Sequence, residues 1–537
     1  MAESGHVGHD ERRLAELGYK QELTRAWSSF TNFAISFTII SVLAGCFTNF
    51  SFAWTAGGPA AVAIGWPVLC LFVLLVAVSM AELTSAFPTA GGPYWWAAKL
   101  GGAGWSWFTG WFNMVGLVGI VAGVGYGAAI FLNAVLSLYG VTIGGINFAT
   151  ANPSAVLHHE FVLFLGILLL YTLVNIFADR LLAIFNNISV WWHVLGVLVI
   201  IGVLAFVPDH HTSTKFVFTH TFNNTGFHGG ATSGAFFWLY VLPVGFILTM
   251  YTQTGYDASA HTAEETRDAA LGAAKGVWKS VFYSAIAGWF VLLAFLYAAS
   301  NTGGITKAGG SSISIFETAM ANHVWGAKLV LIIATVGQLF CGAAGLTSAS
   351  RTWYAFSRDR GMPGWWIFRR LNQSRVPLYA VIAVAAVSLI ITIPAYWGNK
   401  VGVPWAYFAI TAICTVGLYI AYIIPVYLRL RQGNRFQAGP WSLGRHYRWV
   451  NAGAILFVLL VVYSLDIPIV PAGVPWDKNF DWTSVNYSPL VLVVGLLVGI
   501  WWIISAKNKY TGPVRTIDEL ELGPPVEEPP PHPATGS

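Results

Sequence analysis

The chain has 537 residues, of which 56% are hydrophobic and only 9% are charged, with a formal net charge of +5 at pH 7. An ordinary soluble domain carries roughly 25% charged residues. This composition therefore excludes a conventional soluble protein and favours a chain whose surface faces hydrocarbon. The 25 Trp and 21 Tyr agree with that interpretation, since both residue types concentrate at membrane interfaces.

The chain begins with a polar tail, residues 1–27, in which no cleavable signal peptide is visible. Residues 10–27 could form a short interfacial helix. Crossing a bilayer takes about 20 largely apolar residues. Twelve segments qualify, of which the first and third are long enough to be broken or strongly tilted: 28–56, 61–86, 104–138, 158–178, 182–207, 233–258, 276–300, 327–356, 376–395, 403–428, 449–470 and 487–506. The C-terminal tail, 507–537, is expected to be disordered, because it is rich in Pro and Glu.

The positive residues predict the orientation. With twelve spans, both termini and the even-numbered loops share one side, and that side holds 23 of the 28 lysines and arginines. Cytoplasmic loops carry the excess of Lys and Arg. We therefore expect a multi-pass protein of the cell (plasma) membrane with both termini in the cytoplasm.

Two of the spans contain interruptions. The first is interrupted at Ser41-Val42-Leu43-Ala44-Gly45, and the sixth at Thr252-Gln253-Thr254-Gly255-Tyr256-Asp257. If spans 1–5 and 6–10 are inverted repeats, these are corresponding positions, and paired interruptions point to a binding site at the membrane midplane. The unwound backbone would offer N–H groups to an anionic group and C=O groups to a cationic one. The alternative is that Gly45 and Gly255 only allow close helix packing.

Four segments resemble the amino acid–polyamine–organocation superfamily, most closely its amino acid/choline branch, which includes γ-aminobutyrate and choline permeases. The motifs are the run from Glu82 to Trp96 at the end of span 2, Gly255-Tyr256-Asp257 followed by Glu264-Glu265, Ser350-Arg351 followed by 354–363, and Ala44-Gly45-Cys46-Phe47 in span 1. Span 1 departs from the family's G-S-G pattern at Leu43 and Ala44, which leaves ω-amino acids, choline and polyamines open as substrates. The resemblance covers roughly residues 15–510.

The resemblance implies an all-α integral membrane protein with a 5+5 inverted-repeat fold. The first repeat would be 28–207 and the second 233–428, with helices 1 and 6 broken and helices 11 and 12 added at 449–506. It implies a secondary active transporter for amino acids or amines such as γ-aminobutyrate. The substrate would contact the first interruption (Ser41, Val42, Leu43, Ala44, Gly45) and the second (Thr254, Gly255, Tyr256, Asp257).

Ionisable groups inside membrane spans are functional candidates. Asp257 either neutralises or gates an ammonium group of the substrate, or it caps the second half-helix or pairs with a cytoplasmic arginine. Glu82 is expected to be a structural partner of an inner-loop arginine. Glu264, Glu265 and Arg351 are expected at the cytoplasmic mouth, as gate or structural residues.

Two sets of residues are candidates for the coupling ion. His193 in span 5 lies where proton-coupled relatives often carry a lysine, and histidine titrates near physiological pH. The alternative is an interfacial histidine beside two tryptophans. Thr347 and Ser348 in span 8 lie where sodium-coupled members of this fold bind the ion, although hydroxyl residues are also common in helix packing.

The sequence gives no indication of an enzyme, a cofactor, a metal site or nucleic-acid binding. It contains no H-E-x-x-H, P-loop or G-x-S-x-G motif. Cys46, Cys70, Cys341 and Cys414 lie in apolar segments and are expected to be buried thiols. The competing functions are a choline or polyamine permease or exchanger, a transporter-like nutrient sensor, and a channel. The short tails argue against a sensor with its own signalling domain.

Overall fold

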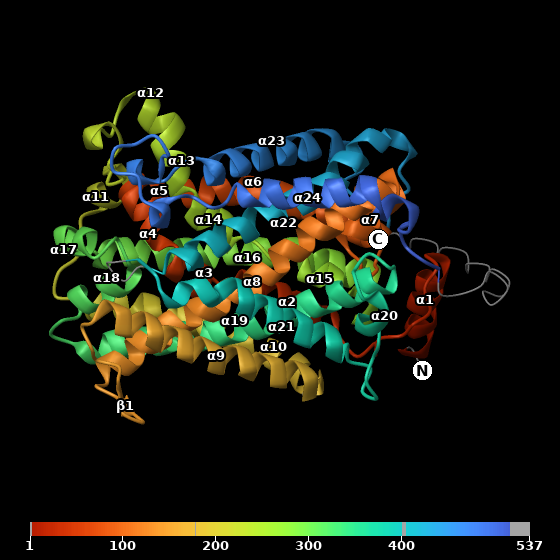
Figure 1. The fold of residues 1–537 in the computed structure, drawn as a ribbon, viewed down its shortest axis with the longest axis horizontal. Coiled ribbons are helices and arrows are strands. Elements are labelled where there is room, and N and C mark those ends of the chain that lie inside the picture. Colours follow the sequence, from red (N-terminus) through yellow and green to blue (C-terminus); the bar gives the residue numbers. More distant parts are fainter. Residues whose placement is uncertain (1–2, 178, 400–403, 516–537) are drawn as a thin grey trace, which may run out of the picture.

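The computed structural model describes residues 3–177, 179–399 and 404–515. Long helices run side by side along the longest axis of the molecule (Figure 1). Helices α1 (Glu3–Glu16), α7 (Pro93–Gly101) and α20 (Trp365–Phe368) lie at one end, which we call the terminal end. The opposite end, here called the distal end, holds the hairpin of β1 (Thr142–Ile143) and β2 (Ile146–Asn147).

The helices of the first half follow the predicted spans. They are α2 (Ser29–Ile40) with α3 (Val42–Thr48), α5 (Gly58–Ala63) with α6 (Gly65–Ala86), α8 (Ala103–Leu138), α9 (Pro153–Phe177) and α10 (Asp179–Phe206). Although α8 was expected to be broken or tilted because of its length, it is one uninterrupted helix of 36 residues.

The sixth span is assembled from short pieces, and the later spans are continuous. The sixth contains α12 (Gly234–Phe236), a π-helical turn (Phe237–Val241), α13 (Leu242–Gly245), α14 (Ile247–Thr252) and α15 (Ala258–His261). The later spans are α16 (Ala269–Ala298), α19 (Val324–Arg358), α21 (Leu378–Thr392), α22 (Trp405–Gln432), α23 (Tyr447–Asp466) and α24 (Leu490–Ile504). Short helices at the distal end are α4 (Phe50–Thr55), α11 (Thr214–Thr219), α17 (Thr302–Lys307) and α18 (Ser312–Ala319).

Eleven helical segments of the described chain are long and apolar enough to cross a bilayer. The twelfth predicted span corresponds to α24, an apolar helix of 15 residues that is shorter than a full crossing. The chain is therefore an all-α membrane protein, as predicted, with eleven full-length spans and this shorter apolar helix.

Corresponding spans of the two halves pack against each other. The second span, α6, contacts the seventh, α16, and the third, α8, contacts the eighth, α19. The broken first and sixth spans also contact each other. Each of the first three spans therefore contacts its counterpart in the other half.

The chain ends differ from the sequence expectation in two respects. The N-terminal helix α1 covers Glu3–Glu16, not 10–27. Residues 17–28 form an irregular segment at the terminal end. The predicted disorder beginning at residue 507 does not hold for 507–515. Tyr510 is buried there and contacts Ser106, because its ring packs among the aromatic side chains of α8 and α19. Residues 516–537 lie outside the described residues.

Candidate functional site

The first span is broken at a single residue. Ser41, between α2 and α3, has a φ of 32°, in the left-handed region. The interruption expected over 41–45 is thus shorter than predicted, since Val42–Gly45 belong to α3. Leu43 and Ala44 are strong helix formers, so the helix resumes at once, and the Gly45 N–H already bonds the Ser41 carbonyl at 3.0 Å.

The Ser41 side chain joins the break to the fifth span. Its Oγ lies 2.7 Å from Nε2 of His193 on α10, and both side chains are fully buried. His193 Nδ1 lies 2.7 Å from the carbonyl oxygen of Ser189, which can only accept a hydrogen bond. Nδ1 therefore carries a hydrogen, and Nε2 shares a hydrogen bond with the Ser41 hydroxyl, which can donate or accept. His193 is thus buried inside the protein and is not one of the exposed interfacial residues.

The second break covers residues 253–257, between α14 and α15. Gly255 has a φ of 83°, a conformation that favours glycine, and its N–H donates to the Tyr422 hydroxyl at 3.3 Å. Thr254 Oγ1 donates to the Tyr251 carbonyl at 2.7 Å, and the Tyr256 carbonyl accepts from Ser36 at 2.8 Å. The break is therefore a fixed turn with its own hydrogen bonds.

The two breaks are in direct contact. A Cβ added to Gly45 would lie 2.4 Å from Thr252 Oγ1 and 2.7 Å from its Cα, and one added to Gly255 would lie 2.3 Å from Ile39 Cγ2. Both glycines therefore allow close approach of spans 1 and 6, which is the packing role considered above. The same contact brings the polar turn of one span against the break of the other.

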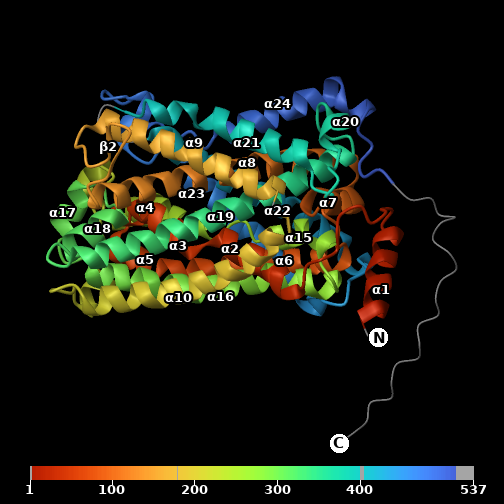
Figure 2. The ribbon, with the colours of Figure 1, turned by 90° about the horizontal axis from the view of Figure 1, so that it is seen from below.

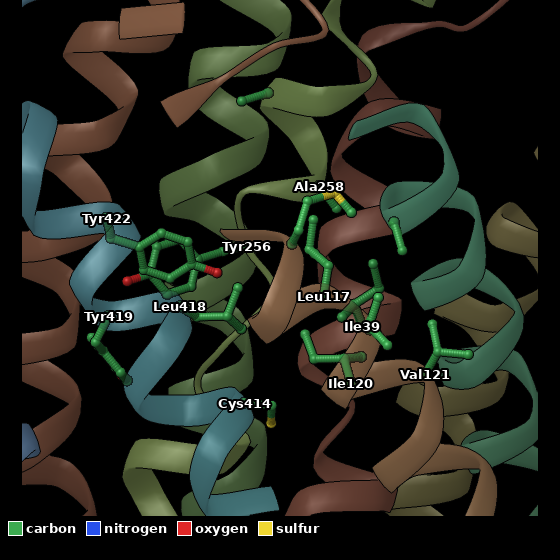
Figure 3. Close-up of a cluster of buried hydrophobic side chains, with 14 of the residues drawn as sticks. Ile39, Leu117, Ile120, Val121, Tyr256, Ala258, Cys414, Leu418, Tyr419 and Tyr422 are labelled. Atoms are coloured by element: carbon green, nitrogen blue, oxygen red, sulfur yellow. The ribbon is translucent and has the colours of Figure 1, made fainter. Parts of the chain in front are cut away.

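An apolar cluster lies between the breaks and the terminal end. Figure 3 shows Ile39, Leu117, Ile120, Leu418 and Tyr256 converging from four different spans. All five are buried, and they belong to one hydrophobic core. These apolar side chains therefore pack directly around the two breaks.

From the distal end a vestibule reaches toward the breaks. It has a volume of about 250 Å³ and is lined by residues of α4, α13, α14 and α22, among them Phe52, Thr55, Val244, Ile247 and Phe408. Ile247 begins α14, whose last residue, Thr252, contacts Gly45. The vestibule therefore ends near the contact of the two broken spans without including residues of either break.

Asp257 is fully buried, and both of its oxygens have partners. Oδ1 accepts from Tyr422 OH at 2.7 Å, and Oδ2 accepts from Asn113 Nδ2 at 3.1 Å and meets His261 Nε2 at 2.9 Å. Asp257 occupies the N-cap position of α15 but makes no capping hydrogen bond with its side chain. Its partners belong to α8, α15 and α22, so neither the expected cap nor an arginine pair describes it.

Three buried ion pairs hold the terminal end. Glu264 pairs with Arg358 at 3.0 Å, Glu265 pairs with Arg351 at 3.1 Å, and Glu82 pairs with Arg429 at 2.8 Å. The partner of Glu82 is an arginine in the last turn of α22, whereas the sequence predicted one in an inner loop. Burial works against ionisation of Glu264, but the guanidinium of Arg358 outweighs it and holds the pKa of Glu264 below its ordinary value.

The irregular N-terminal segment adds a second layer to this closure. Trp27 N–H donates to the Glu265 carbonyl, and Arg267 N–H donates back to the Trp27 carbonyl, each at 2.9 Å. The Tyr19 hydroxyl donates to Asp359 at the end of α19, 2.9 Å away. The segment therefore links the sixth span to the eighth across the terminal end.

The hydroxyls of the eighth span lie away from the first break. Gly337 and Cys341 are the residues of α19 that contact Leu43 and the Ile39 carbonyl. Thr347 lies six residues beyond Cys341, about 9 Å further along the helix, and it donates to Asn175 on α9 at 2.8 Å. Ser348 Oγ is buried without a hydrogen-bond partner among the described residues.

The sequence did not predict the partners of Asp257. It also did not predict that Arg358 pairs with Glu264. His261 had a detectable signal, because it lies four residues after Asp257 and so faces the same side of a helix. Asn113 and Tyr422 had none, since they come from spans 144 and 165 residues away. The described residues contain no group of three or more His, Cys, Asp or Glu side chains placed to hold a metal ion.

Known proteins similar to this chain are amino acid permeases. A family model described as amino acid permease matches residues 28–497. The amino-acid permease BAT1 of Arabidopsis thaliana is 36% identical over 96% of this chain and 98% of its own length, and the BAT1 homolog of Oryza sativa subsp. japonica is 36% identical over 96% and 97%. A GABA-specific permease of Saccharomyces cerevisiae is 26% identical over 95% and 87%. The chain belongs to the amino acid permease family.

Proposed function

We propose that this permease is a secondary active transporter that takes up amino acids or related amines, such as γ-aminobutyrate, by proton symport and alternating access. The observation that carries the proposal is the contact between the two broken spans. It lies near a vestibule that opens at the distal end, and buried ion pairs join the spans toward the terminal end. Paired interruptions of this kind mark the midplane site of transporters that work by alternating access.

The substrate would bind where the breaks meet. The backbone at Ser41, where α3 begins, and at 254–257 would contact its carboxylate and ammonium groups, since these are the non-helical residues of the two breaks. Gln253 supports this placement, because both polar atoms of its side-chain amide are buried without a hydrogen-bond partner among the described residues. Such atoms are costly unless a ligand or water satisfies them.

His193 is the group that we propose to accept the coupled proton. Its ring is tied to Ser41 at the first break, so a change in its charge acts directly on the backbone that would hold the substrate. Sodium coupling through Thr347 and Ser348 is the weaker alternative, because Thr347 bonds to Asn175 and not toward the break.

Uptake into proteoliposomes tests this proposal. Labelled γ-aminobutyrate, α-amino acids, choline and a polyamine would be offered under imposed proton or sodium gradients. Accumulation of an amino acid or ω-amino acid that depends on the pH gradient is expected. Accumulation only of choline or a polyamine would move the substrate class, and binding without accumulation of any compound would favour a nutrient sensor.

A further inference from the structure

The two ring nitrogens of His261 both face hydrogen-bond acceptors. Nδ1 lies 3.1 Å from the carbonyl oxygen of Ala90, and Nε2 lies 2.9 Å from Oδ2 of Asp257. A carbonyl oxygen can only accept, so Nδ1 carries a hydrogen. Between Nε2 and Oδ2 a second hydrogen is required, because two lone pairs at this distance would repel each other. The arrangement therefore contains one proton more than a neutral histidine beside a carboxylate.

The surrounding groups do not supply that hydrogen from elsewhere. The Tyr422 hydroxyl hydrogen is directed at Oδ1 of Asp257, and its oxygen accepts from the Gly255 N–H. The Asn113 amide donates one of its hydrogens to Oδ2, and no hydrogen bond joins it to His261 among the described residues. Glu264 is already neutralised by Arg358. With its proton the pair is neutral, and without it a single negative charge would be buried, which is costly.

The pair holds a specific piece of backbone. The turn 87–92 connects α6 to α7 and meets α15 at Gly92, which lies against His261, and at Ala90, which bonds to it. The carbonyl oxygen of Ala90 accepts from His261, and its N–H donates to Glu264 Oε1 at 2.9 Å. The short segment from Asp257 to Glu264 therefore grips this turn from both sides of one residue. The grip lies on the terminal side of the second break, beside the apolar cluster.

We propose that Asp257 and His261 form a proton-binding latch that closes the terminal end. With the shared proton in place, α15 is fixed to the turn 87–92 and to α8 and α22. When one proton leaves to water, the imidazole keeps its remaining hydrogen on Nε2, facing the carboxylate of Asp257. The lone pair of Nδ1 then faces the carbonyl oxygen of Ala90 and repels it, and the turn 87–92 is released from α15. The movement rests on the proposed transport cycle, whereas the proton itself follows from the hydrogen-bond geometry.

His193 differs from this pair. Its Nε2 faces the Ser41 hydroxyl, which can donate or accept, so the contacts of His193 require no second hydrogen on its ring. The requirement for an additional proton is therefore specific to His261, whose two nitrogens both face acceptors.

The variant Asp257→Asn should hold the latch shut. Its amide nitrogen can donate to Nε2 of His261 as the shared proton does, while its oxygen accepts from Tyr422. Asn113 can turn its own amide to receive the remaining hydrogen, because its Oδ1 is buried without a partner among the described residues. In His261→Gln the amide can donate to Ala90 or to Asp257 but not to both, so this variant should be loosened at every pH.

Hydrogen exchange of the purified full chain in nanodiscs, read by mass spectrometry between pH 5.5 and 8.5, tests the latch. After correction for intrinsic exchange, protection of the peptides covering 85–96 and 256–266 should fall at least tenfold in the wild type as pH rises. It should stay constant in Asp257→Asn and be at least tenfold lower at pH 5.5 in His261→Gln. Glu160→Gln removes another buried carboxyl, outside the pair, and should respond to pH as the wild type does.

The outcomes separate the latch from the transport proposal. Wild-type protection that is independent of pH overturns the latch, even if uptake is driven by protons. A pH response that survives in Asp257→Asn overturns it as well. Uptake that needs sodium and ignores pH defeats proton symport, yet the exchange measurement still decides whether the pair binds a proton that holds the turn.

Discussion

Gly45 and Gly255 are the residues at which one methyl group would disturb the contact between the broken spans. Gly45 meets the backbone of Thr252, which has little room to move, whereas Gly255 meets the tip of the Ile39 side chain and has a φ of 83°. We therefore expect Gly45→Ala to weaken substrate binding at least tenfold. Gly45→Leu and Gly255→Leu should abolish it while the protein remains inserted in the membrane.

Equilibrium binding to the purified variants checks this expectation. Gly202→Ala is a matched control, because Gly202 is also helical and an added Cβ would meet nothing within 4 Å. Its affinity should equal that of the wild type. Unchanged affinity in both leucine variants would place the substrate away from the breaks and leave the glycines with packing alone.

His193→Gln separates binding from coupling at the first break. Glutamine can still bond to Ser41 but cannot titrate, so exchange of substrate across the membrane should be retained. Accumulation driven by an imposed pH gradient should be lost, because a proton shifts a conformational equilibrium only by its differential affinity for the two states. Counterflow and gradient-driven uptake would be compared in the same proteoliposomes. Full pH-driven accumulation by the variant would exclude His193 as the coupling group.

At the scale of elements, the end of α19 is a junction of three parts of the chain. Asp359 accepts from Tyr19 of the N-terminal segment, from Tyr94 of α7 and from the Val514 N–H near the C-terminus. Burial raises the pKa of Asp359 to about 6, despite the neighbouring Arg358 and these donors. The Asp359 carboxyl in this junction therefore keeps its proton up to a higher pH in the folded protein than in the unfolded chain.

This shift predicts a pH dependence of stability. Because the folded pKa of Asp359 exceeds the unfolded value, about 3.9, its stabilising contribution is complete below pH 4. It is lost as pH rises through about 6. Asp359→Asn is always neutral and should gain thermal stability relative to the wild type, on the order of 1–3 kcal/mol, between pH 5 and 7. The melting temperatures of both proteins would be measured at pH 5 and at pH 7. If the variant differs from the wild type by the same amount at these two pH values, the prediction is wrong.

The elements differ in how far the sequence could predict them. Hydropathy located the long spans, because each must be apolar over its whole length to face lipid. Glycines and polar residues located both breaks, but not that Val42–Gly45 stay helical, which depends on the propensities of Leu43 and Ala44. Four motif residues belong to buried ion pairs: Glu82, Glu264, Glu265 and Arg351.

What the sequence could not give is the choice of partners across the bundle. Asp257 was predicted to cap a helix, meet an arginine or bind an ammonium group, and each was reasonable for a carboxylate after a break. Its actual neighbours, Asn113, Tyr422 and His261, are decided by how α8, α15 and α22 pack. Such contacts depend on tertiary geometry that no local pattern in one sequence encodes.

At the scale of the whole molecule, the two ends are built differently. The distal end is hollowed by the vestibule, and the terminal end holds three buried ion pairs and the N-terminal segment, with a separate hollow of about 630 Å³ lined by Trp107, Arg360 and Tyr510. For substrate to leave at the terminal end, these contacts must break together. A cycle in which ion pairs and the proton latch open in one step would explain why closure is distributed over so many residues.

The same polarity predicts the orientation of the protein. The loops and tails assigned to the terminal side contain 23 of the 28 lysines and arginines, which favours a cytoplasmic location. Tags at both termini should therefore be inaccessible to antibody in intact cells and become accessible in inside-out vesicles. A tag in the distal hairpin, between Ile143 and Ile146, should show the reverse and serves as the control. Accessible termini in intact cells would invert the assignment, and the latch at Asp257 and His261 would then respond to the external pH instead of the cytoplasmic one.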